Sequence, residues 1–253
     1  MFGTLRHRGL PPPIPTQVAS PVPCNVFPVT CTLSSMPPRY LLGIDVGTTA
    51  VKALLVSAGG TVVSRAAGTY PLETPRALWA EQDPGLWWDR TAAAVREALQ
   101  QAAVEPRSIA AVGLTGQMHG LVLLGAGREV LRPAILWNDQ RTGAECDRIR
   151  ARVGAARLLQ LTGNDVLPGF TAPKLLWVAR NEPDVFGRIQ SVVLPKDFIR
   201  ERLTGALATD VTDASGTSLF DVQHRAWSAP VLEALSIPGR WLPPVFESSD
   251  VTG

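Results

Sequence analysis

Residues 41–56 read Leu41-Leu-Gly-Ile-Asp-Val-Gly-Thr-Thr-Ala-Val-Lys-Ala-Leu-Leu-Val56, and the predicted fold is built outward from them. Its two apolar runs, residues 41–44 and 51–56, flank a short polar turn and predict two buried strands. Gly59 and Gly60 then predict a turn into a third strand, residues 61–65. The chain therefore opens its main body with three consecutive strands.

The turn between the first two strands carries residues suited to the phosphates of a nucleotide. Gly47 is expected to take backbone angles that a residue with a Cβ resists, so that successive N–H groups form an anion site. Thr48 and Thr49 add hydroxyl donors, and the Asp45 carboxylate can hold a hydrated Mg²⁺. An ordinary β-hairpin turn is the alternative that this stretch alone leaves open, because short glycine motifs match by chance.

Length and composition exclude several classes of protein. The 253 residues, 45% of them hydrophobic, allow one large domain or two small ones, and no run is long enough to span a membrane. Three cysteines have no metal-ligand spacing and make no disulfide framework, which indicates a reducing, cytoplasmic location. Beyond residue 40 the chain carries 21 basic and 22 acidic side chains, so neither a nucleic-acid surface nor a membrane surface is expected.

Residues 1–39 differ from the rest of the sequence. Nine of the 22 prolines lie there, without any helical or strand period, which predicts a disordered extension. The prolines interrupt the apolar core of a signal peptide and the amphipathic helix of a transit peptide. We favour Met36 as the true start, with residues 1–35 as upstream sequence.

Strands alternate with helices along the remainder, which predicts an α/β fold. Asp83 and Pro84 are expected to cap and begin an amphipathic helix over residues 84–103. Residues 121–124 and 130–137 are expected to pair with each other as strands. Further strands are expected at 109–114 and 191–194, and further helices at 142–153, 173–180 and 195–203.

Polar clusters follow apolar elements at residues 45–49, 115–120, 137–142 and 209–217. Because ligands of α/β sheets gather at the carboxyl ends of strands, the clusters are expected to converge on one cleft. The residues of these clusters and their order along the chain resemble those of the FGGY carbohydrate kinases over residues 40–253. The motifs that carry the resemblance are Gly43-Ile-Asp-Val-Gly-Thr-Thr49, Gly116-Gln-Met-His-Gly120, Trp137-Asn-Asp139 with Arg141, Pro168-Gly-Phe-Thr-Ala-Pro-Lys174, Leu194-Pro-Lys-Asp197 and Thr212-Asp-Ala-Ser-Gly-Thr217.

The resemblance implies the actin-like, ribonuclease-H-like ATPase fold, in which two lobes close over a sugar and ATP. Residues 40–253 then correspond to the N-terminal, sugar-binding lobe, while the C-terminal domain that supplies the adenine pocket is absent from this sequence. A homodimer is one assembly that the resemblance allows. Within the family, the motifs are most similar to the branch that phosphorylates D-xylulose to D-xylulose 5-phosphate, with ATP and Mg²⁺ as cofactors.

Two other functions stay open at this point. One is a truncated lobe that binds a pentulose without transferring phosphate. The other is a family kinase for a different ketose or polyol such as ribulose, although residues 116–120 differ from the glycerol kinase signature. The chain alone is expected to be inactive, because it would grip only one side of the triphosphate.

The resemblance assigns roles to individual residues. Asp213 matches the catalytic general base, which accepts the proton of the attacking sugar hydroxyl. Asp45 matches the catalytic aspartate associated with Mg²⁺, while Gly47, Thr48 and Thr49 match the phosphate loop. A helix cap is the alternative role for Asp213.

The resemblance assigns contact with the sugar to Met118 and His119. Met118 is expected to pack against the carbon skeleton, and His119 is expected to donate to a sugar hydroxyl. A purely structural histidine is the alternative. Asn138, Asp139 and Arg141 are expected to line the same pocket, with solvated surface as their alternative.

Overall fold

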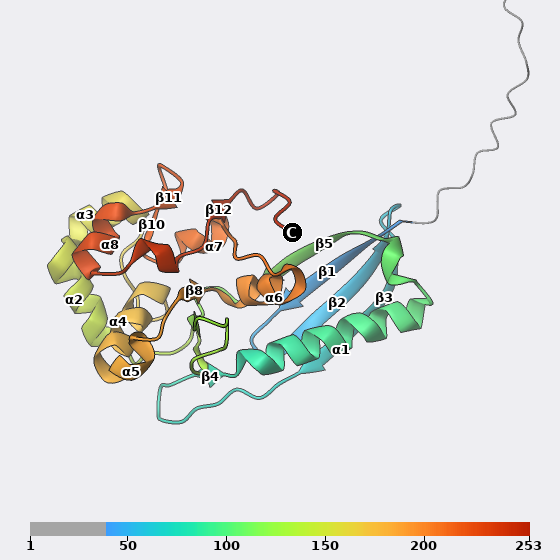
Figure 1. Ribbon diagram of the computed structural model, residues 1–253, viewed down its shortest axis with the longest axis horizontal. Coiled ribbons are helices and arrows are strands. Elements are labelled where there is room, and N and C mark those ends of the chain that lie inside the picture. The colour runs from blue at the N-terminus through green and yellow to red at the C-terminus, as the bar shows by residue number, and fades with distance from the viewer. Residues whose placement is uncertain (1–38) are drawn as a thin grey trace, which may run out of the picture. The chain divides into compact units, whose positions relative to one another are not determined.

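The structure is a computed structural model that describes residues 39–253 (Figure 1). Apart from Arg39, the predicted disordered extension lies outside the described residues, as does the start at Met36, and both stay predictions. Within residues 39–253, no helix is both long and apolar enough to cross a bilayer.

A four-stranded mixed sheet forms from the opening stretch. Strands β1 (Tyr40–Val46), β2 (Ala50–Ser57) and β3 (Val62–Thr69) form an antiparallel meander, which confirms the three predicted strands. Strand β5 (Ile109–Gly116) joins parallel to β1, giving the order β3-β2-β1-β5. The carboxyl ends of β1 and β5 therefore lie side by side, which brings the first two polar clusters to one edge of the sheet.

Two helices lie against this sheet. Helix α1 (Pro84–Ala102) packs on β2 and β3 through an apolar side that includes the fully buried Trp87. Its predicted start is confirmed, because the Asp83 carboxylate accepts from the N–H of Gly85 at 2.8 Å. Helix α6 (Pro195–Thr204) contacts both β5 and α1, so the N-terminus of α6 lies next to the end of β5.

The opposite face of the sheet is open in the described part of the chain. Leu41 and Leu54, which point to this face, are 48% and 38% exposed. A shallow hollow of about 490 Å³ lies over the strands, and Asp45, Lys52 and Thr115 are among its lining residues. The hollow is mainly apolar, with its charged side chains near the polar turn.

The predicted pairing of residues 121–124 with 130–137 is confirmed only in part, because each segment forms its ladder with another strand. Strand β6 (Val122–Leu124) pairs with β8 (Ser191–Val193), and β7 (Ala134–Ile135) pairs with β4 (Glu81–Gln82). The two segments are joined by isolated antiparallel bridges at Leu124–Val130 and Leu121–Ile135, and the Leu131 N–H donates to the Leu123 carbonyl oxygen at 2.9 Å. Since the residues of β6 and β7 are fully buried on both sides, their apolar pattern does not indicate which strand lies beside them.

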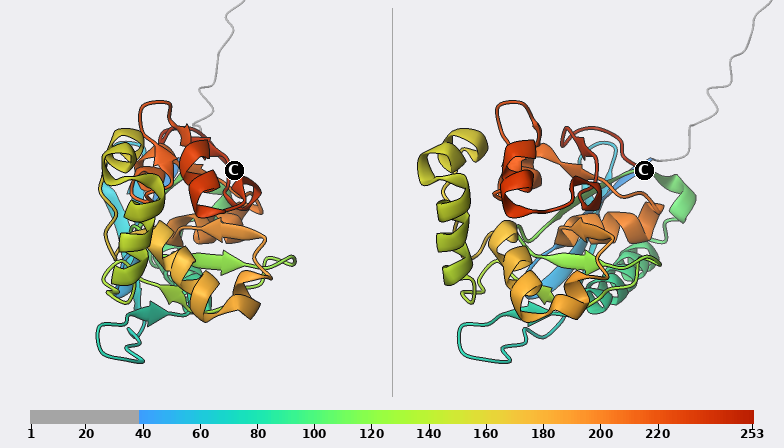
Figure 2. Two further views of the ribbon diagram at one scale, coloured as in Figure 1. Left: turned by 90° about the vertical axis from the view of Figure 1, so that its left-hand side faces the viewer. Right: turned by 60° about the vertical axis from the view of Figure 1, so that its left-hand side comes forward.

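A helical region completes the described chain, and in Figure 1 its helices α2, α3 and α8 lie to the left of β8. It has its own apolar core, which includes Trp177 and Ile149. Figure 2 shows from two further sides that the loop between β3 and β4 projects away from the helices. The remaining elements are α2 (Gly143–Val153), α3 (Ala155–Thr162), α4 (Thr171–Asn181), α5 (Pro183–Phe186), β9 (Thr209–Asp210), α7 (Val211–Ser215), β10 (Phe220–Asp221), β11 (Ala226–Trp227), α8 (Ala229–Leu235) and β12 (Val245–Phe246), with short 3₁₀ turns at Pro106–Ser108 and Gly239–Trp241.

Replacing Asp83 with alanine should lower the free energy of unfolding by about 1 kcal/mol, because an N-terminal N–H of α1 loses its acceptor. Asp89→Ala is the matched control, since Asp89 is an exposed aspartate inside the same helix. Urea denaturation of the two variants measures the difference. Equal losses of stability would contradict the capping role.

Candidate functional site

Gly47 serves the turn between β1 and β2 in a way that the sequence did not indicate. It does not take a positive φ, so the expected reason for a glycine is wrong. Instead, a Cβ at this position would lie 3.0 Å from the carbonyl oxygen of Ala50, which accepts a hydrogen bond from the Gly47 N–H at 3.0 Å. That N–H is therefore used inside the turn, and an anion would have to be bound by the N–H groups of Thr48 and Thr49.

Three side chains from outside the turn fix its shape. The Tyr70 hydroxyl donates to the carbonyl oxygen of Gly47 at 2.5 Å, and Gln82 Nε2 donates to that of Thr48 at 2.7 Å. Burial and then the nearby Asp45 carboxylate raise the pKa of Tyr70, which keeps its phenol protonated as a donor. Trp137 Nε1 donates to Thr48 Oγ1 at 3.0 Å. The Thr48 hydroxyl thus retains its own proton for a ligand.

Asp45 faces the open side of the sheet, directly across from Lys52 on β2 and Thr115 on β5. No three His, Cys, Asp or Glu side chains within residues 39–253 gather into a metal site. A single carboxylate with nearby hydroxyls suits Mg²⁺, which keeps several waters and takes further oxygens from phosphates. Sequence reasoning missed Lys52, although its register opposite Asp45 follows from a two-stranded hairpin.

Close contacts bring the polar clusters together, and glycines make some of these contacts possible. A Cβ on Gly120 would lie 2.5 Å from the Pro195 ring at the start of α6. A Cβ on Gly169 would collide with the carbonyl oxygen of Trp137, and one on Gly216 with the ring of His119. The clusters at 116–120, 137–142 and 209–217 thus meet as predicted, together with residues 168–174 and 194–197.

Asp213 lies in the first turn of α7, where its alternative role as a helix cap is wrong. Asp210 caps this helix, because its Oδ1 accepts from the N–H groups of Thr212 at 2.9 Å and Asp213 at 3.1 Å. The Asp213 side chain is only 13% exposed. Its carboxylate is left available for a role other than capping.

Lys196 is the residue that connects Asp213 to the rest of the site. Its Nζ lies 2.8 Å from Asp197 Oδ1, 2.8 Å from Asp210 Oδ2 and 3.1 Å from Asp213 Oδ2. Burial alone would lower the pKa of Lys196, but these carboxylates together raise it, so the ammonium stays charged. Sequence reasoning missed Lys196, although it stands inside the quoted motif Leu194-Pro-Lys-Asp197.

The pKa of Asp213 reflects competing influences. Burial raises it above the ordinary value, and the negative charges of Asp197 and Asp210 raise it further. Lys196 acts in the opposite direction. A carboxylate whose pKa is raised toward the working pH is a better proton acceptor once ionised.

Met118 and His119 lie in the loop that follows β5. Met118 is 55% exposed, so its side chain is accessible from solvent. The His119 ring is partly buried, and its Nδ1 lies 2.7 Å from the carbonyl oxygen of Gly216 at the end of α7. The structure therefore brings His119 and the Asp213 helix together.

Asp139 and Arg141 are buried, so the alternative of a solvated surface is wrong for both. Asp139 accepts from the Ala80 N–H at 2.7 Å and from Arg141 Nη2 at 2.7 Å. The Arg141 guanidinium lies 3.6 Å from the ring centre of Trp79 and contacts Trp177. These groups already have partners, which suits support of the pocket wall better than contact with a sugar.

Asn138 and Lys174 differ from that pair. The Oδ1 atom of Asn138 is buried and finds no hydrogen-bond partner among the described residues. Lys174 on α4 is fully buried within the otherwise apolar stretch 172–178, and its Nζ donates to the carbonyl oxygens of Gly169 at 2.7 Å and His119 at 2.8 Å. A lone lysine in an apolar stretch was the signal that could have identified Lys174.

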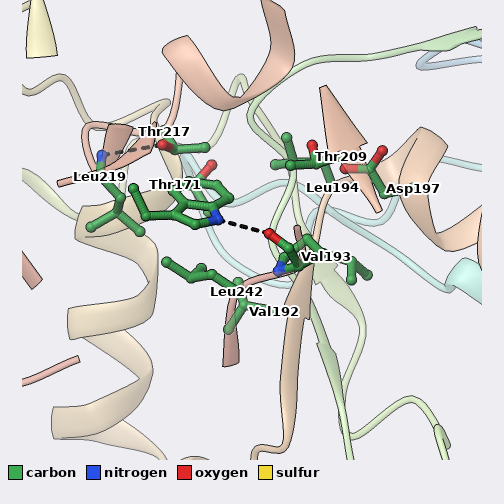
Figure 3. Close-up of a pocket in the computed structure, with 11 residues that line it drawn as sticks. Thr171, Val192, Val193, Leu194, Asp197, Thr209, Thr217, Leu219 and Leu242 are labelled. Atoms are coloured by element: carbon green, nitrogen blue, oxygen red, sulfur yellow. Dashed lines mark hydrogen bonds between the residues drawn. The ribbon is translucent and has the colours of Figure 1, made fainter. Parts of the chain in front are cut away.

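A small internal cavity of about 10 Å³ lies beside Asp197 and Thr209 (Figure 3). Most of its other lining residues are apolar, including Val192, Leu194 and Leu242. A single water needs roughly 10–15 Å³, so this cavity excludes a sugar. Neither it nor the hollow over the sheet is lined by Met118, His119 or Asp213.

Comparisons with known proteins agree with this geometry. Residues 40–253 match the N-terminal domain of the FGGY family of carbohydrate kinases. The chain is 45% identical over 212 residues to a xylulose kinase of Escherichia coli (strain K12), covering 84% of this chain and 43% of that protein. The chain thus spans less than half the length of this relative.

Solved structures give the same result. A xyloylose kinase from Brucella ovis superposes with a TM-score of 0.81 at 42% identity, covering 85% of this chain and 45% of that one. A gluconate kinase from Lactobacillus acidophilus superposes with a TM-score of 0.79 at 31% identity, covering 85% and 43%. The predicted actin-like, ribonuclease-H-like fold of sugar kinases is thereby confirmed.

Lys196→Met should raise the pKa of Asp213 further, because it removes the positive charge that opposes burial and carboxylate repulsion. Since a base works only when ionised, proton acceptance by Asp213 would then begin at higher pH. Carbon-13 NMR titration of the carboxyl, assigned with Asp213→Asn, measures the shift. In Lys196→Arg, which keeps the positive charge, the pKa of Asp213 should stay close to that in the unmodified protein. An unchanged Asp213 pKa in folded Lys196→Met would contradict the assignment.

Proposed function

The chain belongs to the FGGY family of carbohydrate kinases, and we propose that the whole protein transfers a phosphoryl group from ATP to D-xylulose. The product is D-xylulose 5-phosphate. The observation that carries the proposal is the largely buried Asp213 carboxylate, 13% exposed, held by Lys196 at 3.1 Å next to the helix end that contacts His119. Similarity to xylulose kinases over the same residues supports the choice of sugar.

Asp213 acts as the general base. A sugar hydroxyl is a weak nucleophile, and a carboxylate within hydrogen-bond distance accepts its proton as the oxygen attacks the γ-phosphorus. Lys196 holds the carboxylate and favours its ionised form. Because the Asp213 side chain is only 13% exposed, little water competes with the sugar hydroxyl for its carboxylate.

Asp45, Thr48 and Thr49 take the phosphate side. Mg²⁺, when bound with ATP, neutralises charge that develops on the transferring phosphoryl group. Asp45 would hold the ion through water, while the N–H groups of Thr48 and Thr49 and the Thr48 hydroxyl would donate to phosphate oxygens. Gly47 keeps the turn tight enough for this arrangement. The adenine pocket belongs, in this proposal, to a C-terminal domain of the whole protein.

Met118, His119 and Asn138 take the sugar side. The exposed Met118 offers an apolar surface to the carbon skeleton, and the buried Asn138 Oδ1 offers an acceptor that has no partner among the described residues. Asp139 and Arg141 support this wall from behind. A binding lobe without phosphotransfer is the second candidate, favoured because the residues proposed for the sugar side all lie within this chain.

Calorimetry on the 253-residue chain should detect weak binding of D-xylulose. His119→Ala should weaken it further, because the ring is lost from the sugar side of the site. His224→Ala is the matched control, since His224 is exposed and hydrogen-bonds Asp221 instead. Equal or tighter binding of glycerol or D-ribulose would move the protein to another branch of the family.

The 253-residue chain alone should show little or no ATP-dependent phosphorylation of D-xylulose. Phosphoryl transfer depends on positioning and charge stabilisation from both sides of the triphosphate. Supplying the C-terminal half of a xylulose kinase, as a longer chain or separately, should restore turnover in a coupled ADP-release assay. Asp213→Asn should then lower the rate about 10²–10⁴-fold while sugar binding persists. Ordinary turnover by the 253-residue chain alone would show that the site is divided differently.

A further inference from the structure

The ring of His119 has a defined orientation. Its Nδ1 lies 2.7 Å from the carbonyl oxygen of Gly216, and its face lies against Phe170, with 4.6 Å between the ring centres. A carbonyl oxygen only accepts hydrogen bonds, so Nδ1 must be the donor and must carry a proton. The partner therefore determines which ring nitrogen is protonated.

The backbone of His119 is held as firmly as its ring. The residue takes a φ of 63°, in the left-handed region that non-glycine residues rarely adopt. Its carbonyl oxygen accepts from Lys174 Nζ at 2.8 Å and from Thr171 Oγ1 at 3.2 Å. Two donors from α4 thus fix the backbone while Gly216 fixes the ring, so the imidazole cannot easily turn over.

The electrostatic surroundings keep this ring neutral. Burial lowers the pKa of His119 below its ordinary value, and it outweighs the hydrogen bond to Gly216, which acts in the opposite direction. At neutral pH the ring then holds one proton. Because that proton is on Nδ1, the Nε2 atom presents a lone pair.

Nε2 is available to a ligand. No hydrogen bond to Nε2 occurs within residues 39–253. Nε2 is also absent from the buried atoms without a partner in that range, so it is accessible to solvent. We propose that Nε2 of His119 accepts a hydrogen bond from a sugar hydroxyl, so that this position selects a group that can donate. This inference rests on the proposed function, and it reverses the direction expected from sequence, in which His119 donates.

The direction of this bond restricts the substrate. A hydroxyl can donate to Nε2, whereas a ketone oxygen, a carboxylate or a fluorine atom would set lone pairs against a lone pair. The carbonyl oxygen of a ketose must then point away from Nε2 of His119. An acid such as gluconate could not present its carboxylate to this position.

Nitrogen-15 NMR of the histidine rings tests the first step in the 253-residue chain without any ligand. At neutral pH, His119 should show a protonated Nδ1 and an unprotonated Nε2. The signals are assigned by their loss in His119→Asn, and His224 serves as the internal reference. A proton on Nε2, or on both nitrogens, would overturn the inference while leaving the proposed function untouched.

Titration with D-xylulose tests the second step. The Nε2 signal should move on binding, while Nδ1 stays protonated. Among analogues with one hydroxyl at a time replaced by fluorine, one should bind about tenfold more weakly and leave Nε2 unshifted, since a neutral hydrogen bond is lost. If every analogue shifts Nε2 as D-xylulose does, the acceptor role is wrong although the sugar binds. If D-xylulose itself does not bind, the proposed function fails with it.

Discussion

The ion cluster around Lys196 is the interaction on which the site depends. One buried ammonium lies within 3.1 Å of three carboxylates, from Asp197, Asp210 and Asp213. Burying such charges is costly, and removing one partner of a buried pair typically destabilises by about 3–5 kcal/mol. The cluster joins α6, β9 and α7. The negative charge of Asp213, the proposed base, therefore also helps to hold these three elements together.

Steric fit extends this constraint to the sugar side. Gly216 lies just beyond α7, and its missing Cβ leaves room for the His119 ring. Lys174 reaches the same loop from α4 and bonds the backbone of His119. A substitution in α7 that moves Gly216 would therefore also move the His119 ring. We expect the effects of substitutions at Asp213 and at His119 to be non-additive.

The sequence predicted local structure well and long-range partners poorly. The three opening strands, the Asp83 cap and the family motifs follow from short patterns, and the structure agrees with them. The partners of residues 122–124 and 134–135 do not follow, because fully buried strands have no polar side to set their pairing. The Lys196 cluster does not follow either, because it joins α6 to residues 210 and 213 through tertiary contacts that residue spacing cannot indicate. The Asp210 cap is local, but the motif that pointed to Asp213 did not show that Asp210 caps α7.

The central claim is that the sugar site lies where the loop after β5 meets α7, and not in the larger hollow over the open face of the sheet. Amide chemical-shift mapping of the nitrogen-15-labelled chain during titration with D-xylulose tests it most directly. We expect saturable shifts to gather at residues 117–120, 170–172 and 212–217. Shifts confined to residues 43–45, 52–54 and 113–115, which line the hollow, would contradict it.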